Sequence, residues 1–119
     1  GRPYRRCARG DRSSPSPYVI ARLTERAERE MNSIDERWRE EADYAPDLFR
    51  GELLAMLERL EKAPTVGIVF ATVDSETLYR VLEQRSRYHV YYALQGNNVV
   101  VQSIWSAQRK GAPFLAGPR

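Results

Sequence analysis

The last third of the chain, Leu78–Leu115, reads LYRVLEQRSRYHVYYALQGNNVVVQSIWSAQRKGAPFL. Aromatic and β-branched residues fill three runs of it, which predicts strands at Leu78–Glu83, Tyr88–Leu94 and Asn98–Ser106. A Gly-Asn-Asn turn joins the last two strands, and a basic segment punctuated by Gly and Pro follows them. Cations are threaded through the whole stretch, namely Arg80, Arg85, Arg87, His89, Arg109 and Lys110. The pattern therefore predicts a small sheet whose surface meets a negatively charged partner.

The second of these strands has two different faces. Successive side chains of a strand point to opposite sides. One side of this strand is apolar or aromatic throughout and consists of Tyr88, Val90, Tyr92 and Leu94. We expect that side to pack against helices. The other side then presents His89, beside Arg80 and Arg87 if neighbouring strands pair in antiparallel fashion.

Two helices are predicted upstream of the sheet. The first follows a short strand at Tyr18–Leu23 and begins after Thr24, a favourable N-cap residue. It has one apolar stripe, and its i,i+4 charge pairs, such as Arg26 with Glu30, are interpreted as a solvated face. The second helix begins near Pro46 and runs to about residue 62. The short link between the two predicts an antiparallel αα-hairpin.

Two other stretches show little regular pattern. Residues 1–17 contain almost no core-forming side chains and are predicted to be a disordered basic lead-in or extension. Thr65–Thr77 includes strand-like residues, but Gly67 and the pair Asp74-Ser75 interrupt them. We therefore expect a loop there, with room for one short strand. Residues 18–119 are expected to form a single domain.

Together these elements predict an α+β fold with the order β-α-α-β-β-β. The αα-hairpin is expected to pack on one face of a small, twisted, mainly antiparallel sheet, with the first strand at an edge or between two of the others. Because two helices cover only one face, the other face is expected to stay partly open and to carry the cations.

Composition narrows the functional class. The chain has 119 residues, 42% of them hydrophobic, which is enough for one small core. Its net charge of +3 is a mild excess of 19 Lys and Arg over 16 Asp and Glu. Cys7 is the only cysteine and His89 the only histidine, so neither an internal disulfide nor a metal site is expected. With no apolar run of membrane-spanning length and no secretory signal, a cytoplasmic protein without a cofactor is the default expectation.

The chain resembles the RelE/ParE superfamily of type II toxins. The resemblance rests on the element order, the strands RYHVYY (Arg87–Tyr92) and VVVQSIW (Val99–Trp105), and the tail SAQRKGAPFL (Ser106–Leu115). The basic tail followed by Gly-x-Pro is most similar to the ParE-like branch. The resemblance implies a toxin that is neutralised by a cognate antitoxin whose extended tail wraps it. ParE-like members inhibit DNA gyrase, whereas RelE-like members cleave messenger RNA on the ribosome.

The resemblance also implies which residues a RelE-like nuclease would use. Such cleavage needs cations that stabilise the transition state and a group that moves the proton of the attacking 2′-hydroxyl. Arg80 and Arg109 stand at basic positions of that set, and His89 stands where an arginine is usual. Leu82 occupies a lysine position. His89 can act as a base because the pKa of imidazole lies near neutrality, so the nuclease remains an alternative.

The C-terminal tail, by contrast, does not fit a RelE-like nuclease. The position of the tail tyrosine is taken by Phe114 or Leu115, and neither side chain can exchange a proton. We therefore favour a ParE-like gyrase inhibitor without chemistry of its own over the RelE-like nuclease. A third hypothesis is an inactive remnant that only binds its antitoxin, with Phe114, Leu115 and Tyr91 as the contacts. The expected target-binding residues are Arg80, Arg87, His89, Arg109 and Lys110.

Overall fold

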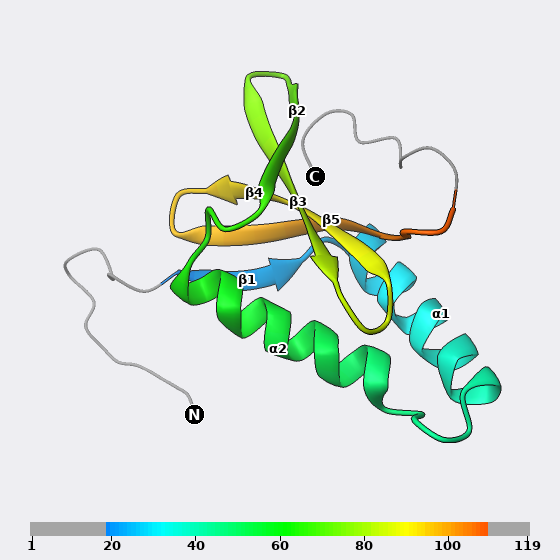
Figure 1. The fold of residues 1–119 in the computed structure, drawn as a ribbon. Coiled ribbons are helices and arrows are strands. Elements are labelled where there is room, and N and C mark those ends of the chain that lie inside the picture. Colours follow the sequence, from blue (N-terminus) through cyan, green and yellow to red (C-terminus); the bar gives the residue numbers. More distant parts are fainter. Residues whose placement is uncertain (1–18, 110–119) are drawn as a thin grey trace.

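Five strands form one sheet in the order β1-β5-β4-β3-β2, and both helices lie on the same side of it (Figure 1). The computed structural model describes residues 19–109. Every neighbouring pair of strands is antiparallel except β1 and β5, which are parallel. The α+β class, with a helix pair on one face of a mainly antiparallel sheet, is therefore confirmed. The elements are β1 (Ile20–Leu23), α1 (Glu25–Glu41), α2 (Leu48–Lys62), β2 (Ile68–Val73), β3 (Glu76–Glu83), β4 (Tyr88–Gln95) and β5 (Asn98–Ser106).

The structure has one strand more than the sequence predicted, because the loop expected within residues 65–77 contains the edge strand β2. Gly67 does not break this strand; a Cβ atom at that position would lie 2.7 Å from the hydroxyl oxygen of Tyr92, so Gly67 permits a close contact. Asp74 and Ser75 form the turn to β3 with φ angles of 53° and 65°, a conformation typical of two-residue hairpin turns. The one short strand that the sequence left room for is therefore present, and the apparent interruptions are a contact and a turn.

The core lies between the two helices and the sheet. Thr24 is the N-cap of α1, as predicted, and its hydroxyl accepts a hydrogen bond from the backbone N–H of Ala27 at 3.1 Å. The alternation predicted for β4 is confirmed, since Val90 and Tyr92 are fully buried on the helix side. The other fully buried side chains of this core are Ala27, Phe49, Leu53, Leu60, Val99 and Val101. Within residues 19–109, no helix is long and apolar enough to cross a membrane.

The side of the sheet without helices is more closed than expected. Leu78, Tyr91 and Ala93 are buried there in a second small cluster, which Phe70 of β2 and Trp105 of β5 flank. The Phe70 and Tyr91 rings meet edge to face with their centroids 4.9 Å apart. Tyr91 is consequently only 1% exposed. Strand β2 thus covers part of the sheet face that was expected to stay open.

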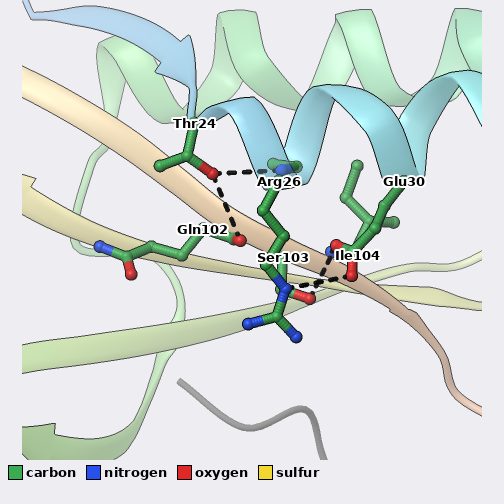
Figure 2. A network of polar contacts seen from close by, with 7 residues as sticks. Thr24, Arg26, Glu30, Gln102, Ser103 and Ile104 are labelled. Atoms are coloured by element: carbon green, nitrogen blue, oxygen red, sulfur yellow. Dashed lines mark hydrogen bonds and ion pairs between the residues drawn. The ribbon is translucent and has the colours of Figure 1, made fainter. Parts of the chain in front are cut away.

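The outer edge of β5 is protected by α1 beyond the point where the short β1 ends. The backbone N–H of Thr24 still donates to the Val101 carbonyl at 2.9 Å. Further along, Glu30 reaches down from α1, and its Oε1 accepts both the Ile104 backbone N–H at 3.0 Å and the Ser103 hydroxyl at 2.9 Å (Figure 2). Its Oε2 pairs with the Arg26 guanidinium at 3.2 Å. The pair Arg26–Glu30, expected on the solvated side of α1, instead lies against the sheet.

Candidate functional site: a basic face on the side without helices

Cationic and aromatic side chains from three strands and two connections share the side of the sheet without helices. Strand register places them: His89 on β4 lies opposite Leu82 of β3 and opposite Trp105 of β5, and Arg80 lies opposite Tyr91. We use the term basic face for Arg80, Arg87, His89, Trp105 and Arg109. The antiparallel pairing on which the predicted proximity of His89 to Arg80 depended is confirmed.

Arg80 is held above an aromatic ring. Its guanidinium carbon lies 5.4 Å from the ring centroid of Phe70, and that ring in turn packs on Tyr91. A guanidinium over an aromatic face is attracted by the ring quadrupole. The guanidinium N–H groups can still donate hydrogen bonds to an anion. The β2 strand thus positions one cation of the basic face.

The other end of the basic face is built in the same way. The Arg109 guanidinium carbon lies 3.9 Å from the centroid of Trp105. The segment after β5 is tied to the β3–β4 hairpin, because the Ala107 backbone N–H donates to the Arg87 carbonyl at 2.9 Å. Arg87 itself has a φ of 65°, which ends the hairpin turn. These contacts hold Arg87 and Arg109 at the same end of the sheet.

His89 lies between these cations. Burial, together with the positive charges of Arg80 and Arg87, lowers the pKa of the His89 imidazole below its ordinary value of 6.5. The ring is therefore neutral at pH 7 and can accept a proton or a hydrogen bond. Its nearest ring is Tyr91, at 6.1 Å between centroids. No hydrogen bond to the imidazole exists within residues 19–109, and no group of three or more His, Cys, Asp or Glu side chains that could hold a metal ion is found there.

Two carboxylates support the hairpin from the α2 side. Both Glu52 oxygens accept backbone N–H groups, from Arg85 and Ser86, at 2.8 Å each. Glu83 is fully buried beside them, and its Oε1 accepts the Ser86 hydroxyl at 3.1 Å. Burial raises the pKa of Glu83 to about 8; the Ser86 hydrogen bond opposes this shift, and the charge of Glu52 adds to it. The hairpin that carries Arg87 therefore rests on a protonated carboxyl group at neutral pH.

Comparison with known proteins gives a likeness of fold. No family model and no curated protein sequence matches the chain. A solved structure described as a chromosomal ParDE TA system from P. aeruginosa is similar, with a TM-score of 0.60 and 11% sequence identity over 76% of this chain and 97% of that one. The chain has a ParE-like fold. Because so low an identity shows the fold alone, the roles of individual residues in this ParE-like fold depend on its own geometry.

The structure brings together four of the five residues predicted to bind the target. Arg80, Arg87, His89 and Arg109 lie on one face of the ParE-like fold, and Lys110 lies outside the described residues. Arg85, by contrast, lies on the α2 side, close enough to Glu52 to lower its pKa. Among the predicted antitoxin contacts, Tyr91 is buried, and residues 114 and 115 lie outside the described residues.

Two aromatic residues of this ParE-like fold contribute to the basic face although no site role was predicted for them. Phe70 and Trp105 carry the guanidinium groups of Arg80 and Arg109. The site role of Trp105 could have been predicted from the sequence. The turn between β4 and β5 fixes their register, and that register places Trp105 opposite His89 in the antiparallel pair. The contact of Phe70 with Arg80 could not be predicted from the sequence, because the segment that contains Phe70 was interpreted as a loop.

Proposed function

We propose that the chain is the toxin component of a type II toxin–antitoxin system and that it inhibits DNA gyrase by protein–protein binding. The ParE-like fold supports the toxin assignment. The observation that carries the target assignment is the basic face, where Arg80 and Arg109 are held on aromatic rings beside a neutral His89. Pre-positioned guanidinium groups bind an acidic protein surface with little loss of side-chain freedom. Such binding needs no chemical step.

The proposed partner that neutralises this toxin is a cognate antitoxin. Its contacts would be Phe114, Leu115 and Tyr91. Because Tyr91 is buried beneath Phe70, its contact with an antitoxin requires that β2 move or that the contact be made at the rim of the second cluster. Ile68 and Val69, which precede Phe70 in β2, have exposed apolar side chains, at 67% and 60%.

A RelE-like messenger RNA nuclease is the second candidate, with Arg80, His89 and Arg109 as the catalytic residues. One observation favours it: His89 is neutral at pH 7 and lies next to two arginines, which suits a base that works on a phosphodiester. Against it, the position beside His89 on β3 is occupied by Leu82, which supplies neither charge nor proton.

An assay with purified gyrase tests the proposed inhibitor function directly. We expect the chain to inhibit DNA supercoiling by gyrase and the double variant Arg80→Glu/Arg109→Glu to lose this inhibition by about tenfold or more, since each substitution reverses a charge on the basic face. The matched control is Arg59→Glu on the exposed side of α2, which should inhibit like the original chain. His89→Ala should leave gyrase inhibition largely intact. Inhibition that survives the double variant would exclude the basic face as the contact.

The nuclease alternative has its own assay. In a cell-free translation system, the nuclease would cut transcripts in the ribosomal A site and His89→Ala would abolish the cuts. The gyrase proposal expects uncut transcripts with both proteins. In cells without antitoxin, filamentous growth with an induced DNA-damage response supports gyrase as the target, and unaffected growth supports the inactive remnant.

A further inference from the structure

Strand β2 is an edge of the sheet that borders only β3 within residues 19–109. Figure 1 shows the β2–β3 hairpin projecting beyond the rest of the sheet and away from both helices. The free edge of a strand presents a row of backbone N–H and C=O groups that can pair with another strand. The β2 edge is therefore accessible to a second polypeptide.

The opposite edge of the sheet is closed by carboxylates from the two helices. Glu61 of α2 accepts the backbone N–H of Ala21 in β1 at 2.8 Å. Glu30 of α1 accepts the backbone N–H of Ile104 in β5. In the part of the chain that the structure describes, no side chain makes a hydrogen bond of this kind to residues 68–73. One edge of the sheet is thus protected against pairing, whereas β2 is left available.

Exposed hydrophobic side chains gather at the start of β2. Val66, Ile68 and Val69 are three of the six large hydrophobic side chains that are exposed among the described residues. Ile68 pairs with Arg80 of the basic face, and Val69 pairs with Tyr79, which packs on the helix-side core. Because paired residues of neighbouring strands point to the same side, Ile68 lies on the side of the basic face and Val69 on the helix side. The edge is thus apolar on both sides, which suits extension of the sheet by another strand.

The charges of the β2–β3 hairpin make this edge complementary to itself. Strand β2 has no charged side chain. Arg80 lies opposite its first residue, whereas Asp74 and Glu76 lie at the turn that follows its last residue. Antiparallel pairing of two identical β2 strands brings the basic end of each hairpin beside the acidic end of the other, whereas parallel pairing brings like charges together. The edge therefore favours a second copy of this chain in antiparallel orientation.

We propose that two copies of the chain pair through their β2 strands in antiparallel fashion and form a two-fold symmetric dimer with one continuous sheet. The two-fold axis of such a strand pair is perpendicular to the sheet. The helices of both copies then lie on one side of the sheet and both basic faces on the other. Each copy uses the same strand, so the interface closes at two copies. This dimer goes beyond the proposed function, because its formation requires neither gyrase nor an antitoxin.

A β-bulge limits the strength of this pairing. The register between β2 and β3 shifts between Val69 and Ala71. A bulge increases the local twist of an edge strand and shortens the stretch over which a second strand pairs regularly. The interface is also small, since β2 has 6 residues. We therefore expect a reversible dimer with a Kd on the order of 10–100 μM.

Sedimentation equilibrium of the full chain at physiological ionic strength, from about 1 to about 500 μM, measures this association. We expect the mean mass to rise from 13.7 kDa towards twice that value. Ile68→Lys and Val69→Lys should each weaken dimerisation by about tenfold or more, because each places two charges at an apolar interface. Both side chains are exposed, and circular dichroism checks that each variant is folded.

The matched control is Leu54→Lys, which adds the same charge at an exposed apolar position of α2. Its dimerisation should stay within about twofold of that of the original chain. A mixture of isotope-labelled and unlabelled chains locates the interface by NMR. We expect contacts between the β2 strands of the two copies.

Three results would overturn the proposal. The chain could stay monomeric at every concentration, which would leave the β2 edge to a strand of a different protein. The dimer could persist unchanged in Ile68→Lys and Val69→Lys, or Leu54→Lys could weaken it as much as they do. Gyrase inhibition by the same variants is measured separately, so a failed dimer and a failed proposed function give different results.

Discussion

The Glu30 carboxylate of α1 accepts the backbone N–H of Ile104 in β5 at 3.0 Å. The same oxygen accepts the Ser103 hydroxyl, and the second oxygen pairs with Arg26. On the edge of β5 that faces away from β4, no strand pairs with this part of β5 within the described sheet, since β1 pairs only with residues 98–101. One side chain thus satisfies a backbone donor that an adjacent strand would otherwise take.

Replacing this carboxylate should therefore destabilise the fold. We expect Glu30→Ala to lower the free energy of unfolding by about 1–3 kcal/mol, because it leaves the Ile104 N–H unsatisfied at a buried position. Urea denaturation measures the change. Glu28→Ala, on the exposed side of the same helix turn, is the control and should change stability by less than about 0.5 kcal/mol. Equal effects of the two substitutions would show that the Glu30 contacts contribute nothing.

Tyr92 and Gly67 form a coupled pair. The Tyr92 hydroxyl accepts the Gly67 N–H at 3.0 Å and donates to the Pro64 carbonyl at 2.8 Å. We expect Tyr92→Phe to cost about 1–3 kcal/mol, because two backbone groups lose their partner. Gly67→Ala should also destabilise, since its Cβ would lie 2.7 Å from the hydroxyl. In the double variant the clash with the oxygen is gone, so thermal denaturation should show a cost smaller than the sum of the two.

The buried carboxyl of Glu83 should make stability fall as the pH rises. Its pKa is raised from 4.5 to about 8 in the folded chain. Between these two values the unfolded chain has released the proton and the folded chain still holds it, so the unfolded state binds fewer protons and stability decreases with pH. The slope is at most about 1.4 kcal/mol per pH unit, and it disappears above pH 8, where both states are ionised.

Glu83→Gln removes this proton and is the matched variant. We expect the decline of unfolding free energy between pH 6.5 and 8 to be absent or much reduced in it. This pH window excludes the titration of His89. Because the His89 pKa is lowered in the folded chain, it makes stability rise with pH, but only in the range just below its ordinary value of 6.5. Denaturation curves of both proteins across the window provide the measurement. A decline of the same size in both would mean that another group is responsible.

Glu52 connects helix α2 to the basic face. Burial opposes its ionisation, but the hydrogen bonds from Arg85 and Ser86 outweigh burial and lower the Glu52 pKa. We expect Glu52→Ala to speed amide exchange at Arg85 and Ser86 by about tenfold or more and to weaken the proposed inhibition of gyrase, because the hairpin that holds Arg87 loosens. Amide hydrogen exchange followed by NMR reports the first effect. Glu58→Ala, exposed on the same helix, should change neither.

Most of the fold follows from local patterns in the sequence. Thr24 marked the start of α1, and the alternation around Val90 and Tyr92 identified the buried side of β4. Strand β2 was predicted only as a loop with room for one short strand, because its flanking residues are compatible with both a loop and a strand. Glycine breaks many strands, yet at Gly67 it makes room for the Tyr92 hydroxyl, and Asp74-Ser75 lacks the Asn-Gly signature of a tight hairpin although it forms one.

The candidate site was predictable only where strand register fixes neighbours. Alternation and antiparallel pairing placed His89 beside Arg80. The ring that holds Arg80 comes from β2, whose contact depends on the twist of the sheet and not on sequence spacing. Likewise, the pair Arg26–Glu30 has the ordinary i,i+4 pattern of a solvated helix side. Glu30 can contact β5 only because β1 ends at Leu23 and leaves the edge of β5 beyond Val101 without a paired strand.

The parallel pairing of β1 with β5 joins the first described element to the last one. During synthesis, Ile20–Leu23 emerges from the ribosome long before Asn98–Ser106. The strand must then wait, unpaired, until nearly the entire domain has been translated, because no other strand borders it. Completion of the native sheet is thus postponed until β5 has been translated, some seventy residues after β1.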